Sequence, residues 1–289
     1  MAPLALDTKL KLNSGYEIPQ LGFGVYQTPP EDTERCVTEA LNAGYLHIDS
    51  AAYYKNEAAS AKAILARSRD QIFFTSKIMP GTLGYESVIS QVDRMLKETS
   101  LGYLDLVLLH APYGGSQARK DSWKALVESV EAGKIRSIGV SNYGVHHLDE
   151  LEKHISELEE ERGGEGKGGV LSVGQWEIHP WVPRQDIVDW CAKRNVVVEA
   201  YSPLVQGKRW GEAVPKKLAE KYGKSEAQIL LRWSLQRGLV PLPKSVTTER
   251  IKANADLFDF ELTEEEVKEL MTNEYAPVCW DPNVEPLEK

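Results

Sequence analysis

The sequence predicts an α/β protein built as a closed barrel of eight parallel strands, a (β/α)8 or TIM barrel. Short apolar runs alternate with helical patterns along the chain, and most of these runs end in a polar residue. The length of 289 residues suits one such barrel, which typically needs about 250. We therefore expect a single domain over residues 1–289, with its active face at the carboxyl ends of the strands.

The first part of the chain predicts a β-hairpin that precedes the barrel. Residues 8–12 (TKLKL) alternate polar and apolar side chains, residues 13–15 (NSG) form a turn, and residues 16–24 (YEIPQLGFG) are extended. We expect this hairpin to close the bottom of the barrel, which is the end opposite the active face.

Eight short apolar runs with helical segments between them predict the barrel strands. Strands that alternate with helices imply a parallel sheet, and eight such units favour closure of that sheet into a barrel. The predicted strands lie at 21–25, 46–50, 72–78, 105–110, 135–140, 172–178, 196–201 and 239–243.

Capping signals and periodicity locate several helices. Asp121 precedes an amphipathic run that ends at Gly133, and Ser225 precedes another that ends at Gly238. A helix over 86–99 has apolar residues at a 3.6-residue period. Its apolar face consists of Val88, Val92, Met95 and Leu96.

Three later segments look like additions to the barrel. Residues 157–169 run from a charged helix into a Gly-rich loop, and residues 261–273 predict a helix capped by Thr263. The tail, residues 274–289, contains several prolines and should be irregular. The adjacent Cys279 and Trp280 favour a tail that folds over the active face.

Charge and composition exclude several classes of partner. The formal net charge is 34 − 43 = −9, which disfavours nucleic acid and anionic membranes as partners. No apolar run approaches the roughly 18–20 residues of a membrane span, and no signal peptide is evident at the start of the sequence. The three cysteines share no CxxC spacing. We expect a cytoplasmic monomer with free thiols.

Four polar residues at the predicted strand ends suggest a reaction centre. Each of Asp49, Tyr54, Lys77 and His110 alone has an ordinary structural explanation. Neighbouring strands of a barrel would nevertheless bring them to the same rim. There Asp49 neutralises Lys77, and Lys77 stabilises a phenolate and lowers the pKa of Tyr54. Tyr54 then donates a proton to a carbonyl oxygen, while neutral His110 hydrogen-bonds that oxygen.

A second set of strand-end residues suits a dinucleotide. Ser141, Asn142 and Gln175 offer the donors and acceptors that a carboxamide needs, and the ring of Tyr201 suits stacking on a flat heteroaromatic ring.

The end of the last predicted strand suits a phosphate group. Lys244, Ser245 and Arg250 supply two cations and a hydroxyl there. Gly22 and Gly24 do not start a Rossmann fingerprint, because Gln27 stands at the position of the third glycine and no helix begins there. Gly24 still permits close approach of a ligand to the backbone.

A rival hypothesis uses histidines as metal ligands. His47, Asp49, His110 and His179 are the residue types that hold catalytic zinc. The chain has no HxH pair, however, and no carboxylate that would bridge two metals. We therefore expect no metal centre.

Eight motifs in order resemble the aldo-keto reductase family, and fungal members in particular. The resemblance covers essentially the whole chain. It implies a barrel that reduces aldehydes and ketones reversibly with NADPH, without metal or flavin. The motifs are GFGVYQ, DSAAYYKNE, FFTSK, DLVLLHAP, GVSNY, GQWEIHP, AYSPL and PKSVTTERIKAN.

The resemblance also implies a role for each motif residue. It assigns Asp49, Tyr54, Lys77 and His110 as the catalytic tetrad. The implied cofactor contacts are Ser141, Asn142 and Gln175 to the nicotinamide amide, Tyr201 to its ring, Ser202 and Leu204 to the pyrophosphate, Lys244, Ser245 and Arg250 to the 2′-phosphate, and Asn254 to the adenine.

The sequence departs from the family pattern at several positions. Tyr26 stands where many members have tryptophan, and Ala253 stands where many have a glutamate. The ion pair that clamps the cofactor in animal members is missing, since Gln27 replaces its lysine. We therefore predict faster cofactor release, with Lys208 or Arg209 contacting the pyrophosphate instead.

Bulky residues of the rim loops and the tail are candidates for the walls of the substrate pocket. A pocket of this kind suits aryl aldehydes, α-keto esters and hydrophobic ketones. An alternative function is a barrel that binds NADPH as a regulatory or sensing subunit. The candidate wall residues are Tyr26, Met79, Tyr113, Trp181 and Trp280.

Overall fold

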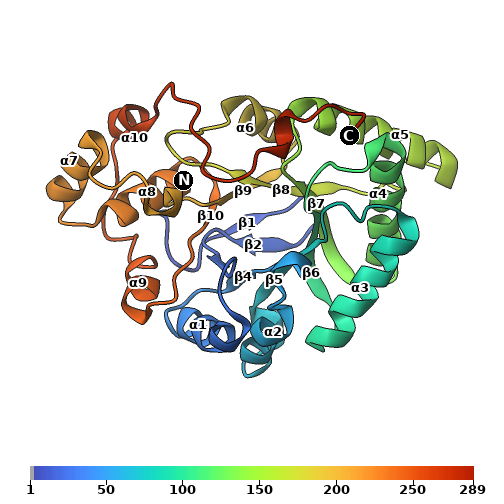
Figure 1. The fold of residues 1–289 in the computed structure, drawn as a ribbon, viewed down its shortest axis with the longest axis horizontal. Helices are drawn as coiled ribbons and strands as arrows, with labels where there is room; N and C mark the ends of the chain where they lie inside the picture. Colours follow the sequence, from blue (N-terminus) through green and yellow to red (C-terminus); the bar gives the residue numbers. More distant parts are fainter. Residues whose placement is uncertain (1–2) are drawn as a thin grey trace.

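A sheet of parallel strands forms the centre of the protein, in a computed structural model that describes residues 3–289 (Figure 1). Within these residues eight strands follow one another around the sheet in sequence order, β3 to β10. Their bounds are β3 Phe23–Gly24, β4 His47–Asp49, β5 Phe73–Ile78, β6 Leu104–Leu109, β7 Ile135–Ser141, β8 Leu171–Glu177, β9 Val197–Tyr201 and β10 Val240–Leu242.

Two backbone hydrogen bonds close the sheet between its first and last strands. The amide of Gly22 donates to the carbonyl of Pro241 at 3.1 Å, and the amide of Gly24 donates to that of Pro243 at 3.0 Å. A Cβ at Gly22 would lie 2.5 Å from the Leu242 side chain, so the closure requires glycine there. The predicted (β/α)8 barrel is confirmed.

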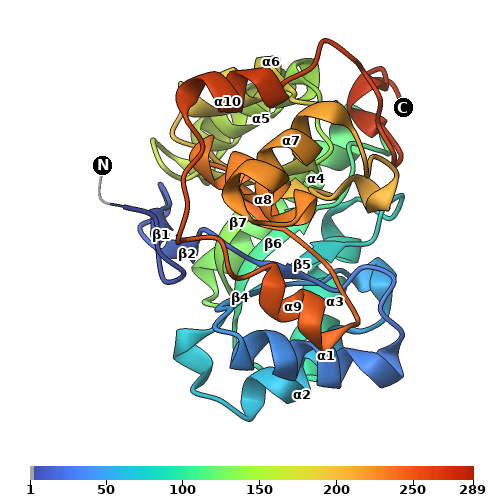
Figure 2. The ribbon, with the colours of Figure 1, turned by 90° about the vertical axis from the view of Figure 1, so that its left-hand side faces the viewer.

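Helices cover the outside of the barrel, and Figure 2 shows α7, α8 and α10 grouped together, with α9 beside α1. The helices are α1 Pro30–Asn42, α2 Glu57–Leu65, α3 Tyr85–Thr99, α4 Gly115–Glu131, α5 Val145–Arg162, α6 Gln185–Ala192, α7 Ala213–Tyr222, α8 Glu226–Gln236, α9 Thr248–Ala253 and α10 Glu264–Leu270. No helix within residues 3–289 combines the length and the apolar character that crossing a bilayer requires.

Most predicted helix boundaries agree with the structure, and one is wrong. Ser225 and Thr263 cap α8 and α10, since each side chain accepts a hydrogen bond from the third amide of its helix. Asp121, predicted to start a helix, lies inside α4. That helix begins at Gly115, directly after the left-handed backbone of Gly114. Asp121 instead accepts a hydrogen bond from the side-chain Nε2 of Gln117, one turn earlier.

The extents of three other segments follow the sequence with small differences. α10 covers Glu264–Leu270, which is shorter than the predicted 261–273. α5 runs through the charged segment to Arg162 and ends at Gly163, whose left-handed backbone starts the Gly-rich loop. On α3, Val88, Val92 and Met95 are buried as predicted, and Leu96 is partly buried.

The hairpin closes the bottom of the barrel as predicted. Strands β1 (Lys9–Lys11) and β2 (Glu17–Pro19) pair antiparallel. Leu12 and Ile18 pack into an apolar cluster whose other buried members are side chains from the barrel strands. Those members are Phe73, Leu106, Leu108 and Val173.

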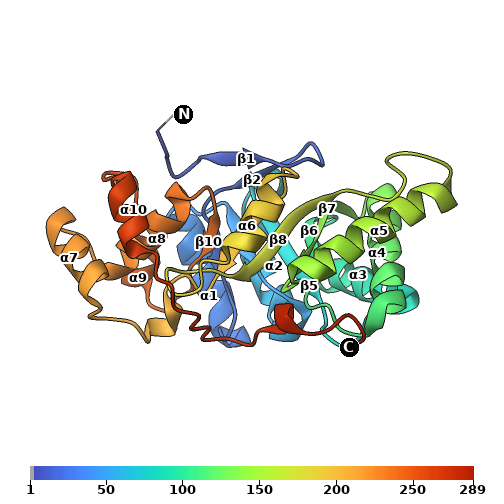
Figure 3. The ribbon, with the colours of Figure 1, turned by 90° about the horizontal axis from the view of Figure 1, so that it is seen from above.

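The tail crosses the opposite face of the barrel, and Figure 3 shows the hairpin and the tail on opposite sides. Residues after α10 are irregular except for one 3₁₀ turn, Pro282–Val284. Glu177, the last residue of β8, accepts hydrogen bonds from the amides of Val278 at 2.6 Å and Cys279 at 3.1 Å. Arg184 pairs with Asp281 at 2.8 Å. These contacts hold the tail over the active face.

Candidate active site

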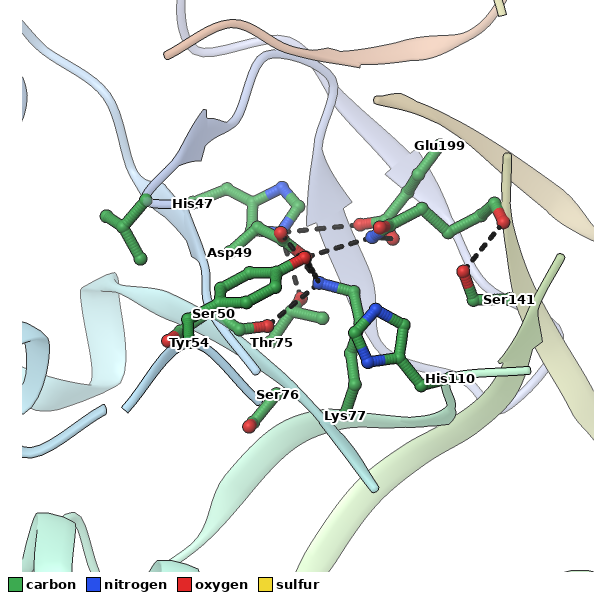
Figure 4. Close-up of polar contacts among 12 residues, drawn as sticks. His47, Asp49, Ser50, Tyr54, Thr75, Ser76, Lys77, His110, Ser141 and Glu199 are labelled. Atoms are coloured by element: carbon green, nitrogen blue, oxygen red, sulfur yellow. Dashed lines mark hydrogen bonds and ion pairs between the residues drawn. The ribbon is translucent and has the colours of Figure 1, made fainter. Parts of the chain in front are cut away.

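Four polar side chains meet at the carboxyl ends of the strands, where the sequence predicted a reaction centre (Figure 4). Asp49 ends β4, Lys77 lies one residue before the end of β5, and His110 directly follows β6. Tyr54 ends the 3₁₀ turn Ala52–Tyr54, in the loop after β4. Because β4, β5 and β6 are neighbours in the sheet, their ends lie side by side.

Lys77 and Asp49 form a buried ion pair at the centre of this cluster. The Lys77 ammonium lies 2.7 and 2.8 Å from the two carboxylate oxygens of Asp49, and it donates to the carbonyl of Ser50 at 2.8 Å. Lys77 is 0% exposed and Asp49 is 4% exposed. A charge this deeply buried requires such a partner. The Tyr54 hydroxyl lies 3.5 Å from the same ammonium.

The pKa of Tyr54 differs from the sequence-based expectation. Desolvation raises the pKa of Tyr54 well above 10, and the charge of Asp49 acts in the same direction. Asp49 lies closer to the Lys77 ammonium than the phenol does. Its negative charge therefore offsets the effect of that ammonium on the pKa of Tyr54. The expected lowering of this pKa is therefore wrong, and Tyr54 is a protonated phenol at neutral pH.

His110 is a neutral imidazole beside Tyr54. Desolvation and the nearby charge of Lys77 hold the pKa of His110 well below 6.5. Its ring centroid lies 5.8 Å from that of Tyr54 in an edge-on arrangement. Nδ1 is buried without a hydrogen-bond partner among the described residues, whereas Nε2 is not among these buried, unpartnered atoms. Nε2 is therefore the nitrogen that a bound oxygen would meet.

The residues predicted to bind a carboxamide lie together at the next strand ends. Ser141 ends β7, Asn142 follows it, and Tyr201 ends β9. The Tyr201 hydroxyl donates to Asn142 Oδ1 at 2.8 Å, and Asn142 Nδ2 donates to the carbonyl of His110 at 3.0 Å. These bonds connect the predicted cofactor residues to the predicted catalytic histidine.

Gln175 connects the same group to the ion pair. Its Nε2 donates to Asp49 Oδ2 at 2.9 Å and to Glu199 Oε2 at 2.8 Å. Sequence reasoning missed Glu199, which is 0% exposed in the middle of β9. The available signal was an acidic residue inside the apolar run VVVEAY, two positions before Tyr201 and hence on the same face of the strand.

The predicted phosphate site holds cations that carboxylates do not neutralise. Lys244 Nζ lies 3.3 Å from the carbonyl of Gln27, and Arg250 is exposed on α9. Within residues 3–289 neither cation forms an ion pair with a carboxylate. Ser245 and Asn254, also predicted to contact the cofactor, are 8% and 6% exposed.

The two basic residues of the loop after β9 differ in whether a carboxylate neutralises them. Arg209 pairs with Glu212 at 3.0 Å and with Glu274 at 2.7 Å, so its charge is already neutralised. Lys208 Nζ lies 3.5 Å from the carbonyl of Val278 in the tail. Of the two residues predicted to replace the clamp, Lys208 retains the freer charge. In the same loop Leu204 is half-buried, and the Ser202 hydroxyl lies 3.2 Å from Cys279 Sγ.

Aromatic rings surround the tetrad on its open side. The ring of Tyr26 lies 4.9 Å from that of Tyr54. The ring of Trp280 lies 5.8 Å from both His110 and Tyr113. The tail therefore supplies one wall of the space above the tetrad. Met79, another predicted wall residue, is half-buried after β5.

Trp181 occupies a different place from the other predicted pocket residues. It is 3% exposed and packs with Val205 and Leu230 in an apolar cluster that also contacts the tail at Ala276 and Val278. Trp181 therefore packs beneath the loop after β9, and its assignment to the substrate pocket stays a prediction.

Two of the three histidines of the metal hypothesis have other partners. His47 Nε2 lies 2.9 Å from the Thr75 hydroxyl, and His179 Nε2 lies 2.8 Å from Glu177. In the part of the chain that the structure describes, no three His, Cys, Asp or Glu side chains are placed to hold a metal ion together.

An open cavity of about 450 Å³ lies at the other end of the barrel, around the starts of β7 and β8. Tyr16, Tyr103 and Arg136 are among its lining residues, and none of the tetrad belongs to it. The chemistry of the carboxyl face is therefore separate from this cavity.

The fold and the site together define a (β/α)8 barrel whose polar centre lies at the carboxyl ends of the strands. The family model described as "Aldo/keto reductase family" matches residues 20–272. An uncharacterised oxidoreductase of Schizosaccharomyces pombe is 42% identical over 98% of this chain and 100% of its own. The glyoxal reductase of Bacillus subtilis is 39% identical, with 93% of each chain covered.

Solved structures give the same result. The aldo/keto reductase of Brucella melitensis superposes with a TM-score of 0.83 at 38% identity, covering 91% of this chain and 98% of its own. A variant of Gox0644 in complex with NADPH has a TM-score of 0.86 at 31% identity, covering 97% of this chain and 99% of its own. The chain belongs to the aldo/keto reductase family and is an oxidoreductase of that family.

Proposed function

We propose that the protein reduces aldehydes and ketones to alcohols with NADPH, in a reversible reaction. The observation that carries this proposal is the position of the Tyr54 phenol, 3.5 Å from the Lys77 ammonium and edge-on to the neutral ring of His110. Family membership supports the reaction class, and the NADPH bound to a variant of the similar protein Gox0644 supports the choice of cofactor.

The residues at the carboxyl face fit a nicotinamide dinucleotide phosphate. Gln175 Oε1 accepts no hydrogen bond from residues 3–289 and is not sealed from solvent, so it is available to a carboxamide. Lys244 and Arg250 are available to the 2′-phosphate. When bound, NADPH supplies the hydride from its nicotinamide C4. The other proposed cofactor contacts are Gly24, Ser141, Asn142, Tyr201, Ser202, Leu204, Ser245 and Asn254.

Tyr54 acts as the proton donor in this proposal. Its high pKa keeps the hydroxyl protonated at neutral pH, so the proton is present when a carbonyl oxygen reaches it. Negative charge develops on that oxygen during reduction, and the phenol proton moves to it. The Lys77 ammonium stabilises the phenolate that remains, and Asp49 holds the ammonium in place.

His110 orients the substrate in the same proposal. As a neutral imidazole it donates a hydrogen bond from Nε2 to the carbonyl oxygen, which places that oxygen near the Tyr54 hydroxyl. A charged imidazolium would instead repel Lys77. Burial and Lys77 together favour the neutral form that this role requires.

Aromatic side chains define the proposed substrate class. Tyr26, Tyr113 and Trp280 surround the tetrad, so hydrophobic carbonyl compounds such as aryl aldehydes and α-keto esters should bind better than free sugars.

A panel of carbonyl compounds assayed with NADPH and with NADH tests the proposal. We expect turnover of aryl aldehydes with NADPH and weaker activity with NADH. Tight NADPH binding without turnover of any compound would contradict the enzymatic proposal and favour the alternative role of a regulatory subunit. Failure to bind either cofactor would contradict both.

Cofactor release provides a second test. Gln27 replaces the lysine of the clamp in animal relatives, so this position cannot form the ion pair that would close over the cofactor. We expect release of NADP⁺ in a single fast phase. Stopped-flow fluorescence that shows a slow closure step followed by slow release would contradict this.

A further inference from the structure

A buried acid lies behind the tetrad and is not used by the proposed mechanism. We propose that Glu199 is a positioning residue that fixes the side-chain amide of Gln175, so that Gln175 presents its oxygen to the carboxamide of the nicotinamide cofactor. The inference rests on the proposed function, because it requires that a nicotinamide cofactor binds at this face.

The strand register brings the two residues together. Gln175 on β8 is the direct neighbour of Glu199 on β9, and Ser141 on β7 is the neighbour of Gln175. Side chains of registered neighbours point to the same side of a sheet. Gln175 and Glu199 both point into the barrel, where they are 1% and 0% exposed. Figure 4 shows Glu199 and Asp49 in the barrel interior beside Lys77.

Two acceptors hold the amide nitrogen of Gln175. Nε2 donates to Asp49 Oδ2 at 2.9 Å and to Glu199 Oε2 at 2.8 Å, which uses both of its protons. Rotation of the amide by half a turn would place its oxygen against the Asp49 carboxylate, which has no proton to donate, and would take the donor away from the carbonyl oxygen of Glu199. The pair of acceptors therefore keeps Oε1 on the open side, where it accepts no hydrogen bond from residues 3–289.

Asp49 alone is less able to fix the amide, because its carboxylate is also bound by Lys77 at 2.7 and 2.8 Å. Glu199 Oε1 lies 3.4 Å from His47 Nε2 but forms no hydrogen bond among residues 3–289. The bond from Gln175 Nε2 to Glu199 Oε2 therefore lies on the side of Gln175 away from the ion pair, where Lys77 does not compete for the acceptor.

The charge of the surroundings matters for this role. The groups that face Glu199 are His47 and Asp49 on β4, Lys77 on β5 and Gln175 on β8. Desolvation and the charge of Asp49 raise the pKa of Glu199 to about 8, so it is mostly a neutral acid at pH 7. A neutral acid still accepts from Gln175 and adds no second negative charge beside Lys77.

A pair of cofactors isolates the contact. The 3-acetylpyridine analogue of NADPH carries a methyl group in place of the carboxamide NH₂, so it has nothing to donate to Gln175 Oε1. Dissociation constants for both cofactors are measured by fluorescence titration on the purified protein. One hydrogen bond contributes about 1 kcal/mol, so we expect Glu199→Met to weaken NADPH binding about fivefold. Binding of the analogue should change less than twofold.

Conservative and distant variants complete the experiment. Glu199→Gln keeps an acceptor oxygen and should restore the preference for NADPH. Glu57→Met removes another buried acid, one that accepts from Ser76 on the outer side of β5, and should leave both dissociation constants unchanged. If Glu199→Met does not fold, Glu199→Asp withdraws the acid by one methylene and should show the same selective loss.

Three outcomes are decisive. Equal weakening of both cofactors would show that Glu199 acts through general packing, and unchanged binding of both would show that it does not hold Gln175. Either result overturns the inference. A wild-type protein that melts cooperatively but binds neither cofactor would instead overturn the proposed function.

Discussion

The two ends of the barrel are built from the same strands and differ in how their polar groups are satisfied. At the amino-terminal end the hairpin inserts Leu12 and Ile18, and Ser14 pairs with Ser137 at 2.8 Å. At the carboxyl end a buried ion pair, a neutral histidine with an unpartnered Nδ1 and a high-pKa phenol lie together. The amino-terminal end therefore contributes to stability through packing, whereas the carboxyl end holds the groups that can react, as is usual for this fold.

The largest effect that tests this contrast is expected for Tyr54→Phe. The change removes one hydroxyl at the carboxyl end, and with it the proposed proton donor. We expect kcat to fall by about 10²–10⁴-fold, with the NADPH dissociation constant changed less than twofold. Single-turnover kinetics and fluorescence titration measure the two quantities.

The matched control is Tyr143→Phe. Tyr143 is also buried, and its hydroxyl has no partner among the described residues, but it belongs to the apolar core. It should leave kcat unchanged. Parallel losses of kcat and of cofactor affinity in Tyr54→Phe would show that Tyr54 was assigned the wrong role.

The opposite pattern is expected for Ile18→Ala at the amino-terminal end. Ile18 is 0% exposed in the cluster that plugs the barrel. Truncation of such a side chain costs about 2–5 kcal/mol of unfolding free energy. Urea denaturation should show this loss, while kcat and KM at 25 °C stay within twofold of the wild-type values. A large change in kcat would mean that the two ends are coupled.

The pH dependence of stability separates Glu199 from the ion pair beside it. Its pKa is raised from 4.5 to about 8 in the folded protein. Between these values the folded state binds a proton that the unfolded state releases, so the unfolding free energy falls as pH rises, by at most about 1.4 kcal/mol per unit. Glu199→Gln lacks this term and should gain stability over the wild type from pH 5 to pH 8.

Urea denaturation at each pH measures the difference between the two proteins. Parallel stability curves for the wild type and Glu199→Gln would contradict the raised pKa. His47 supplies an opposite trend in both proteins, because its pKa is lowered to about 3 and the unfolded state takes up a proton below pH 6.5. Between pH 6.5 and about 4.5 this trend opposes that of Glu199, so Glu199→Gln should lose stability as the pH falls while the wild type changes little.

The sequence predicted the barrel, the hairpin and the tail because periodicity, caps and strand-end residues are local signals. It also pointed to Asp49, Lys77 and His110, because burial of an ionisable residue within an apolar strand costs free energy unless that residue has a partner. It could not predict the pKa of Tyr54, because this pKa depends first on how far the fold removes the phenol from water and then on how close the charge of Asp49 lies.

Other features of the site depend on tertiary structure in the same way. The burial of Trp181 against Val205 and Leu230 follows from how the loop after β9 folds back. Glu199 gave a signal, an acid within an apolar run, but its meaning depends on the register of β8 and β9, which brings Gln175 beside it. Neither the sequence of β8 nor that of β9, taken alone, shows which residues become neighbours across the two strands.

The smallest predicted effect concerns the rim of the carboxyl end, at the proposed phosphate site. Arg250 is exposed and Lys244 is retained in the variant, so Arg250→Ala removes one of the two cations proposed for this site. We expect NADPH binding to weaken about tenfold and NADH binding to change less than twofold, since an exposed charge-assisted contact contributes about 1–2 kcal/mol. The loss of NADPH affinity should become smaller as the salt concentration is raised.

The turnover number provides the control. Because α9 packs on α1 away from the tetrad, kcat at saturating NADPH should not change. Equal weakening of both cofactors would place the 2′-phosphate elsewhere on this face, and a loss of kcat would mean that the rim and the reaction centre are not separable.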